Sequence, residues 1–174
     1  LKDGLTDVYN QTSMGVSGDK TADKYEITRE QQDEYAIQSY VRSKEAWNSG
    51  AFEDEIATVL VPQKKGDPVI VTEDETYKQV NFEKMKLLRP AFSENGTVTA
   101  ANASSINDGA SAVVVASKLF IENENINPIA KIIAYAEAEQ DPTFFTTTPI
   151  LATKKVLAKA NLKLSDIDFF EVNE

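Results

Sequence analysis

The sequence contains no cysteine and no histidine. Without cysteine the chain forms no disulfide and offers no thiolate nucleophile, and without histidine it has no imidazole base. Zinc sites of the usual Cys/His type are therefore excluded. Chemistry carried out by these residues alone would need Ser, Thr, Lys, Tyr or carboxylates, and no carboxylate pair stands out as a general acid and base.

Positive charge and long apolar runs are also scarce. Lys and Arg total 18 against 28 Asp and Glu, which gives a formal net charge of −10. This balance argues against a generic nucleic-acid or membrane surface, although it leaves room for a local basic pocket that binds a phosphorylated ligand. No apolar run approaches the roughly 20 residues that span a bilayer, and no secretory signal is visible.

The composition is otherwise that of a folded domain. A chain of 174 residues is long enough to bury a core. Its content of 41% hydrophobic and 26% charged residues is ordinary for a folded protein. The chain begins with Leu1 instead of Met and stops directly after the strand-like stretch 167–172. We therefore expect both ends to be cuts, so that targeting signals could have been lost with them.

Two helices are predicted in the first third of the chain. Thr28 with Gln31 three residues later fits a capping box, and apolar residues then recur at helical spacing up to the stop at Gly50. A shorter helix is predicted over residues 18–25, with Ser17 as its cap.

The rest of the chain alternates between short strands, loops and helices. Strands are predicted at residues 59–61, 69–71, 97–100, 112–116, 130–136 and 167–172, with a loop-rich stretch at 73–88. The run 112–116 is typical of a strand buried on both faces. Helices are predicted over 118–124 and from the Thr148 cap to Asn161. This order is typical of a layered α/β domain.

Several ordered stretches together resemble the thiolase family. They are residues 3–7, the Met14-Gly15 pair, residues 27–33, residues 95–110 (NGTVTAANASSINDGA), and residues 171–174, which match the start of an Asn-Glu-Ala-Phe motif. The resemblance covers essentially the whole chain and is strongest to the short-chain acetoacetyl-CoA branch of eukaryotes.

The resemblance implies an α/β fold, with a thiolase-like layered α/β/α core and an inserted loop domain. Residues 1–94 would be mainly the CoA-binding loop domain, residues 95–124 the end of the N-terminal core domain, and residues 127–174 the start of the C-terminal core domain, with both cores incomplete. The implied activity condenses two acetyl-CoA to acetoacetyl-CoA and CoA, or runs the reverse thiolysis, in lipid metabolism and the mevalonate pathway. The cysteine that forms the acyl-enzyme and the histidine would lie outside these residues, so the segment alone is expected to be inactive.

The resemblance also implies ligand sites. Residues that would contact coenzyme A, as substrate, are Tyr40, Gln79, Val80, Asn81, Lys84 and Ser104. A potassium ion would be held by Tyr40 and by the backbone carbonyls of Ala100, Ala101 and Ala103, because carbonyl oxygens suit a weakly hydrated cation. Asn173 would hold a water in an oxyanion hole. Ser13 stands where many relatives have a histidine near CoA.

Simpler interpretations of these residues remain open. By spacing alone Tyr40 is a core residue, Lys84 a solvated lysine, Ser104 a polar loop residue and Asn173 a turn residue at the end of a strand. Two other functions also remain: a non-catalytic CoA-binding or assembly module, and a degradative 3-ketoacyl-CoA thiolase. By resemblance the protein would be a homotetramer in the cytoplasm, or otherwise in mitochondria or peroxisomes.

Overall fold

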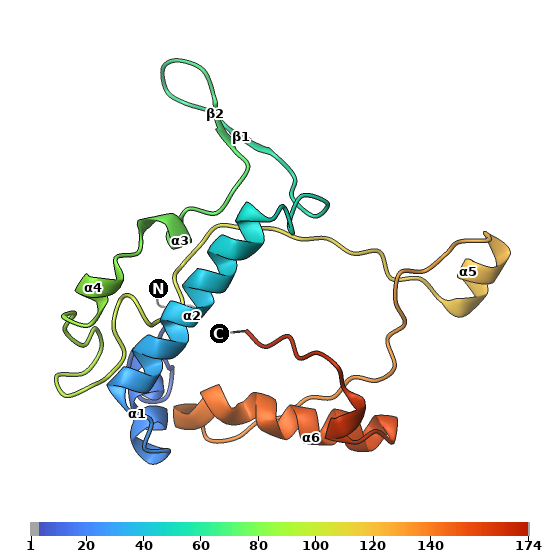
Figure 1. Ribbon diagram of the computed structural model, residues 1–174. Coiled ribbons are helices and arrows are strands. Elements are labelled where there is room, and N and C mark those ends of the chain that lie inside the picture. The colour runs from blue at the N-terminus through green and yellow to red at the C-terminus, as the bar shows by residue number, and fades with distance from the viewer. Residues whose placement is uncertain (1–3, 174) are drawn as a thin grey trace. The chain divides into compact units, whose positions relative to one another are not determined.

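The structure is a computed structural model that describes residues 4–173 and divides into two compact units, residues 1–104 and 105–174 (Figure 1). The first unit contains α1 (Met14–Lys24), α2 (Arg29–Asn48), β1 (Val59–Val61), β2 (Val69–Val71), α3 (Thr76–Gln79) and α4 (Phe82–Met85). The second contains α5 (Lys118–Asn123), the 3-10 helix η1 (Pro142–Thr147), α6 (Thr148–Ala160) and the 3-10 helix η2 (Leu164–Asp166).

Helix α2 begins where the sequence predicts. The Thr28 side chain accepts a hydrogen bond from the Gln31 N–H at 3.2 Å, and the Gln31 side chain accepts one from the Thr28 N–H at 2.8 Å. These reciprocal bonds form the predicted capping box and satisfy two N–H groups that the helix leaves free. The helix ends just before Gly50, whose φ of +74° favours glycine.

Helix α1 begins four residues earlier than predicted. Its N-cap is Ser13, whose side chain accepts a hydrogen bond from the Gly15 N–H at 3.4 Å. Ser17, the predicted cap, is a buried residue inside the helix with 4% of its surface exposed. The prediction was wrong because a serine can serve either as an N-cap or as a small buried residue inside a helix, and the sequence does not distinguish the two roles.

Strands β1 and β2 pair in antiparallel register, with Val59 opposite Val71 and Val61 opposite Val69, which confirms the predicted hairpin. Gly66 lies in the turn between them with φ +87°. The stretch 73–88 was predicted to be loop-rich, and it holds two single-turn helices, α3 and α4. Their shortness explains why no apolar period identifies them in the sequence.

Aromatic packing fixes α3 against the end of α2. The Trp47 ring lies 4.9 Å from the Phe52 ring and 6.5 Å from the Tyr77 ring, measured between centroids, and it stacks with the latter. Tyr77 and Met85 are among the few buried hydrophobic side chains of the first unit. This contact positions the loop that follows α3 beside α2.

Residues 97–99 are irregular backbone instead of the predicted strand, and a turn follows at residues 100–102. Two N–H groups of the irregular segment are bound by a side chain: Asp19 Oδ1 accepts the N–H groups of Thr97 and Val98, each at 2.9 Å. A Cβ on Gly96 would lie 2.3 Å from Asp19 Oδ2, so glycine is what allows this close approach. The strand prediction was wrong because a carboxylate takes the place of a neighbouring strand.

The strands predicted at 112–116, 130–136 and 167–172 are absent among the described residues. Val113 and Val114 are 87% and 97% exposed, so this apolar run has no cover in its unit. A strand is stabilised by pairing and by packing of its faces, and the described residues provide neither here. Apolar composition alone therefore gave the wrong local structure.

In the second unit, helices α5 and α6 confirm the predicted ones. Helix α6 has Thr147 as its N-cap, one residue before the predicted Thr148. It ends at Asn161, which adopts the left-handed conformation with φ 55° and confirms the predicted stop. On one side of α6, the ammonium groups of Lys155 and Lys159 donate to backbone carbonyls of the segment before η1, at 3.0 and 3.1 Å.

None of the helices within residues 4–173 combines the length and apolar character that a membrane span requires.

Candidate functional site

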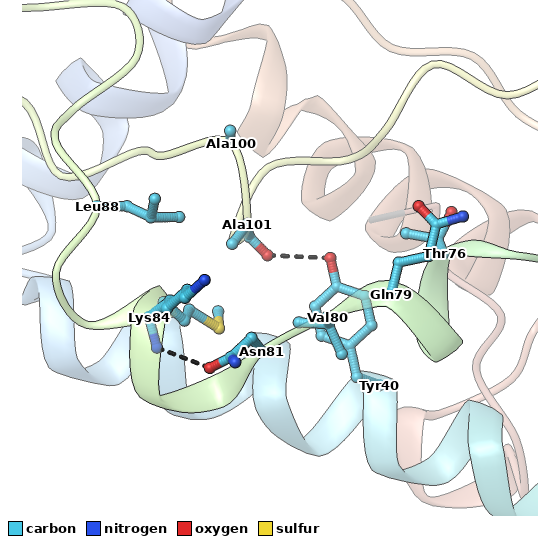
Figure 2. A pocket seen from close by; sticks show the side chains of 10 residues that line it. Tyr40, Thr76, Gln79, Val80, Asn81, Lys84, Leu88, Ala100 and Ala101 are labelled. Atoms are coloured by element: carbon cyan, nitrogen blue, oxygen red, sulfur yellow. Dashed lines mark hydrogen bonds between the residues drawn. The ribbon is translucent and has the colours of Figure 1, made fainter.

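A cavity of about 250 Å³ lies in the first unit, between α2, the α3–α4 region and the turn near residue 100 (Figure 2). Its lining residues are Tyr40, Thr76, Gln79, Val80, Asn81, Lys84, Met85, Leu88, Ala100 and Ala101. Residues predicted to bind CoA or potassium are therefore gathered here from three separate parts of the chain. The gathered ones are Tyr40, Gln79, Val80, Asn81, Lys84, Ala100 and Ala101.

Tyr40 forms the α2 side of the cavity and meets the turn directly. Its hydroxyl donates a hydrogen bond to the Ala101 carbonyl at 3.1 Å, as the dashed line in Figure 2 shows. Its ring lies 6.5 Å from the Phe82 ring of α4, between centroids, at an interplanar angle of 45°. Tyr40 is thus neither a plain core residue nor a free one, because its hydroxyl bonds to the edge of the cavity.

Asn81 and Lys84 occupy opposite ends of the single turn of α4. The Asn81 side chain accepts a hydrogen bond from the Lys84 N–H at 3.0 Å, which caps the helix and fixes where the lysine emerges (Figure 2). Within residues 4–173 no carboxylate pairs with the Lys84 ammonium. An exposed, unpaired ammonium at the rim of a cavity can bind an anionic group of a ligand.

The other lysine near α3 is already engaged. Glu73 accepts hydrogen bonds from Lys78 and from the Tyr77 hydroxyl, and these bonds, that from Lys78 first, hold the pKa of Glu73 below its usual value. Burial and the bond to Glu73 raise the pKa of Tyr77 to about 12. Lys84 is therefore the cation that the cavity offers among its described lining residues.

Three side chains behind the cavity were missed by sequence reasoning. Asp33 of α2 binds Arg29 on its own helix and Asn102 in the turn. Arg29 in turn binds backbone carbonyls at the end of α4. The sequence did contain a signal for Asp33. It lies seven residues before Tyr40 and so shares a helix face with it, and a carboxylate on a buried face needs partners.

The remaining predicted residues lie outside the cavity. Ala103 donates its N–H to the Thr99 carbonyl at 3.0 Å and is half-buried. Ser104 is exposed at the end of the first unit. Asn173 is exposed in irregular backbone of the second unit. Ser13 caps α1.

Two of the oxygens predicted to hold potassium lie close together near the turn. Residues 4–173 hold no group of three or more His, Cys, Asp or Glu that could coordinate a metal ion. Two oxygens of the predicted potassium set, the Tyr40 hydroxyl and the Ala101 carbonyl, lie 3.1 Å apart. Both oxygens are neutral, and the first donates a hydrogen bond to the second.

Two family models match the chain. The model described as thiolase, N-terminal domain, matches residues 1–119, and the model described as thiolase, C-terminal domain, matches residues 126–174. The chain belongs to the thiolase family.

Among individual relatives, a probable acetyl-CoA acetyltransferase of Dictyostelium discoideum is 50% identical over 174 residues, which is 100% of this chain and 42% of that protein. A mitochondrial acetyl-CoA acetyltransferase of Rattus norvegicus is 50% identical over 175 residues, covering 100% of this chain and 41% of that protein. The chain therefore spans less than half the length of these relatives.

A solved structure gives the same result. The Acat5 thiolase from Ascaris suum, crystallised in complex with coenzyme A, is 44% identical and superposes with a TM-score of 0.93, over 100% of this chain and 44% of that one. The fold is therefore the α/β thiolase fold, which confirms the predicted fold class.

Proposed function

We propose that this chain contributes the CoA-binding part of an acetyl-CoA acetyltransferase, which condenses two acetyl-CoA to acetoacetyl-CoA and CoA or runs the reverse thiolysis. The observation that carries the proposal is the cavity beside Tyr40, which gathers CoA-contact residues predicted from stretches about 40 residues apart. The relatives named acetyl-CoA acetyltransferases, and the Ascaris thiolase crystallised with coenzyme A, support the choice of ligand and reaction.

Each lining residue has a role that its chemistry allows. The Lys84 ammonium meets a phosphate oxygen at the nucleotide end of CoA as a point charge. Gln79, Val80 and Asn81 contact the nucleotide, and Tyr40 packs against the ligand from α2. Ser104 follows this turn and hydrogen-bonds the pantetheine arm.

The bond-making chemistry needs residues beyond these 174, because they include no cysteine and no histidine. A cysteine thiolate takes the acetyl group from one acetyl-CoA and releases CoA. A second acetyl-CoA then loses an α-proton to a base, and its carbon attacks the acyl-enzyme and frees the cysteine. Asn173 holds a water that donates to the oxyanion in these steps.

Further features of the protein stay predictions. The predicted potassium site comprises Tyr40 with the backbone carbonyls of Ala100, Ala101 and Ala103. Homotetramer assembly is proposed by resemblance alone, as are the domain divisions 1–94, 95–124 and 127–174. The rat relative is described as mitochondrial, which supports the mitochondrial alternative over the cytoplasmic location first preferred.

Calorimetric titration with CoA tests the proposal, using the protein expressed from its complete reading frame. Replacing Lys84 with Gln should weaken CoA binding about tenfold, because one charge-assisted contact is lost. The matched control is Lys86→Gln, which removes the same charge from an exposed residue that does not line the cavity. Equal affinities of all three proteins, or no CoA binding by the unsubstituted protein, would contradict the proposal.

The non-catalytic module is the second candidate, and the lack of cysteine and histidine in these residues favours it. An assay of acetoacetyl-CoA formation and thiolysis on the same protein distinguishes the two. Tight CoA binding without turnover would support the module. Turnover that prefers long-chain ketoacyl-CoA to acetoacetyl-CoA would instead support a degradative thiolase.

A further inference from the structure

Asp33 is a buried carboxylate that belongs to none of the groups assigned to ligand binding. Its surface is 6% exposed, and both of its oxygens have partners. Oδ2 accepts a hydrogen bond from Arg29 Nε at 2.8 Å, and Oδ1 accepts one from Asn102 Nδ2 at 2.9 Å. A buried carboxylate is expensive to desolvate, so its two partners decide what it does.

On one side, Asp33 controls the turn that carries Ala101. The Asn102 amide that it binds also donates to the Thr97 carbonyl at 3.1 Å, and Asn102 Oδ1 accepts the Thr99 N–H at 2.7 Å. The Thr99 side chain, fully buried, accepts the N–H groups of Ala101 and Asn102, each at 3.3 Å. These bonds fix the direction of the Ala101 carbonyl, which receives the Tyr40 hydroxyl.

On the other side, Asp33 orients the guanidinium of Arg29. Arg29 Nη2 donates to the Met85 carbonyl at 2.9 Å, and Nη1 donates to the Leu88 carbonyl at 3.1 Å. Met85 and Leu88 both line the cavity. A single carboxylate on α2 therefore ties together the two opposite walls of the pocket, the end of α4 and the turn.

We propose that Asp33 is a positioning residue of the pocket: through Asn102 and Arg29 it holds the Ala101 carbonyl against Tyr40 and the end of α4 against α2. The expected effect on CoA affinity rests on the proposed function, whereas the expected effect on the shape of the pocket does not. An amide in place of the carboxylate can accept from one partner but must turn its NH₂ toward the other donor. Asp33→Asn therefore breaks the link between the two walls without changing the size of the side chain.

Amide hydrogen exchange at residues 101–103 measures the local stability of the turn directly and needs no ligand. Asp33→Asn should speed the exchange of the Ala101–Ala103 amides by roughly tenfold. The substitution removes the bond between the Asp33 carboxylate and Asn102, and the turn therefore opens more often. The control is Asp7→Asn, since Asp7 is equally buried, at 8% exposed, but bonds only to its own loop. Exchange at 101–103 should be unchanged in that variant.

Ligand affinity gives the second readout, through a double-substitution cycle on the protein from its complete reading frame, with CoA as the probe. Tyr40→Phe alone should weaken binding about fivefold, and Asp33→Asn alone about tenfold. In the Asp33→Asn background Tyr40→Phe should add little, because the hydroxyl has already lost its partner. A residue that only stabilises the fold would give additive effects.

The outcomes separate the two proposals. Unchanged exchange at 101–103 in Asp33→Asn, or full additivity with Tyr40→Phe, overturns the positioning role. Absence of CoA binding by the unsubstituted protein overturns the proposed function, while the exchange experiment still decides the role of Asp33. If Asp33→Asn does not fold, Asn102→Ala replaces it, because it leaves the Arg29–Asp33 pair intact and removes the side-chain bonds of Asn102 to Asp33, Thr97 and Thr99.

Discussion

At the residue scale, Tyr77 shows how one buried contact changes the chemistry of a side chain. It packs against Trp47, and its hydroxyl donates to Glu73. Both burial and the negative neighbour disfavour the tyrosinate form, which is why the pKa of Tyr77 rises to about 12 from 10.0.

Tyr77 therefore predicts a change at alkaline pH. A raised folded-state pKa contributes stability that is complete below pH 10 and is lost as the pH rises through about 12. The near-ultraviolet difference spectrum between the unsubstituted protein and Tyr77→Phe should show one tyrosinate with a midpoint near 12. A midpoint near 10 would mean that the hydroxyl is solvated and unpaired.

Tyr40 predicts a potassium effect. If its hydroxyl and the Ala101 carbonyl share a potassium ion, replacing NaCl with KCl at constant ionic strength should tighten CoA binding in the unsubstituted protein. Tyr40→Phe should reduce this difference several-fold, because one of the oxygen ligands is gone. Identical affinities in the two salts would remove the potassium prediction and leave the Tyr40–Ala101 hydrogen bond as a structural contact.

At the scale of elements, the helix ends carry the most local information. The capping box of α2 and the end of α6 at Asn161 were both predicted, because each depends on residues within one turn. The single turns α3 and α4 were missed, because a four-residue helix is held by Asn81 and by contacts with α2 instead of by a repeating pattern.

The capping box gives a quantitative prediction for α2. Thr28→Ala should lower the free energy of unfolding by about 1 kcal/mol, because the Gln31 N–H loses its acceptor. Urea denaturation monitored by circular dichroism measures the change. Thr28→Ser keeps the hydroxyl and should restore most of the stability. Equal losses in both variants would show that the Thr28 methyl group, and not the cap, stabilises the helix.

At the scale of the whole molecule, apolar segments of the second unit lack cover. Val113, Val114 and Ile129 are 87%, 97% and 105% exposed. Proteins rarely leave such runs in water, and unpaired strand-like segments associate with other chains. The chain spans less than half the length of its relatives, and this apolar surface is of the kind that packs against further structure.

The 174-residue chain produced alone should therefore bind the dye ANS and associate as its concentration rises. Val114→Lys should lower both signals, because a charge interrupts the apolar run. A comparison with Asn123→Lys, which adds the same charge at an exposed position outside the run, controls for charge effects. Dye fluorescence and light scattering provide the measurements. A monodisperse chain that binds no dye would contradict the prediction.

The sequence by itself determined the capping box of α2, the two strands of the hairpin and the family, because these depend on neighbouring residues or on ordered motifs along the chain. The sequence grouped Tyr40, Lys84 and Ala101 only through the family resemblance, and the tertiary structure decided the contacts that bring them into one pocket. Their arrangement depends on Asp33 reaching Asn102 across 69 residues and on Tyr40 reaching Ala101 across 61. Such contacts follow only from the folded backbone, since a hydrogen bond forms between groups that are close in space, whatever their separation in sequence.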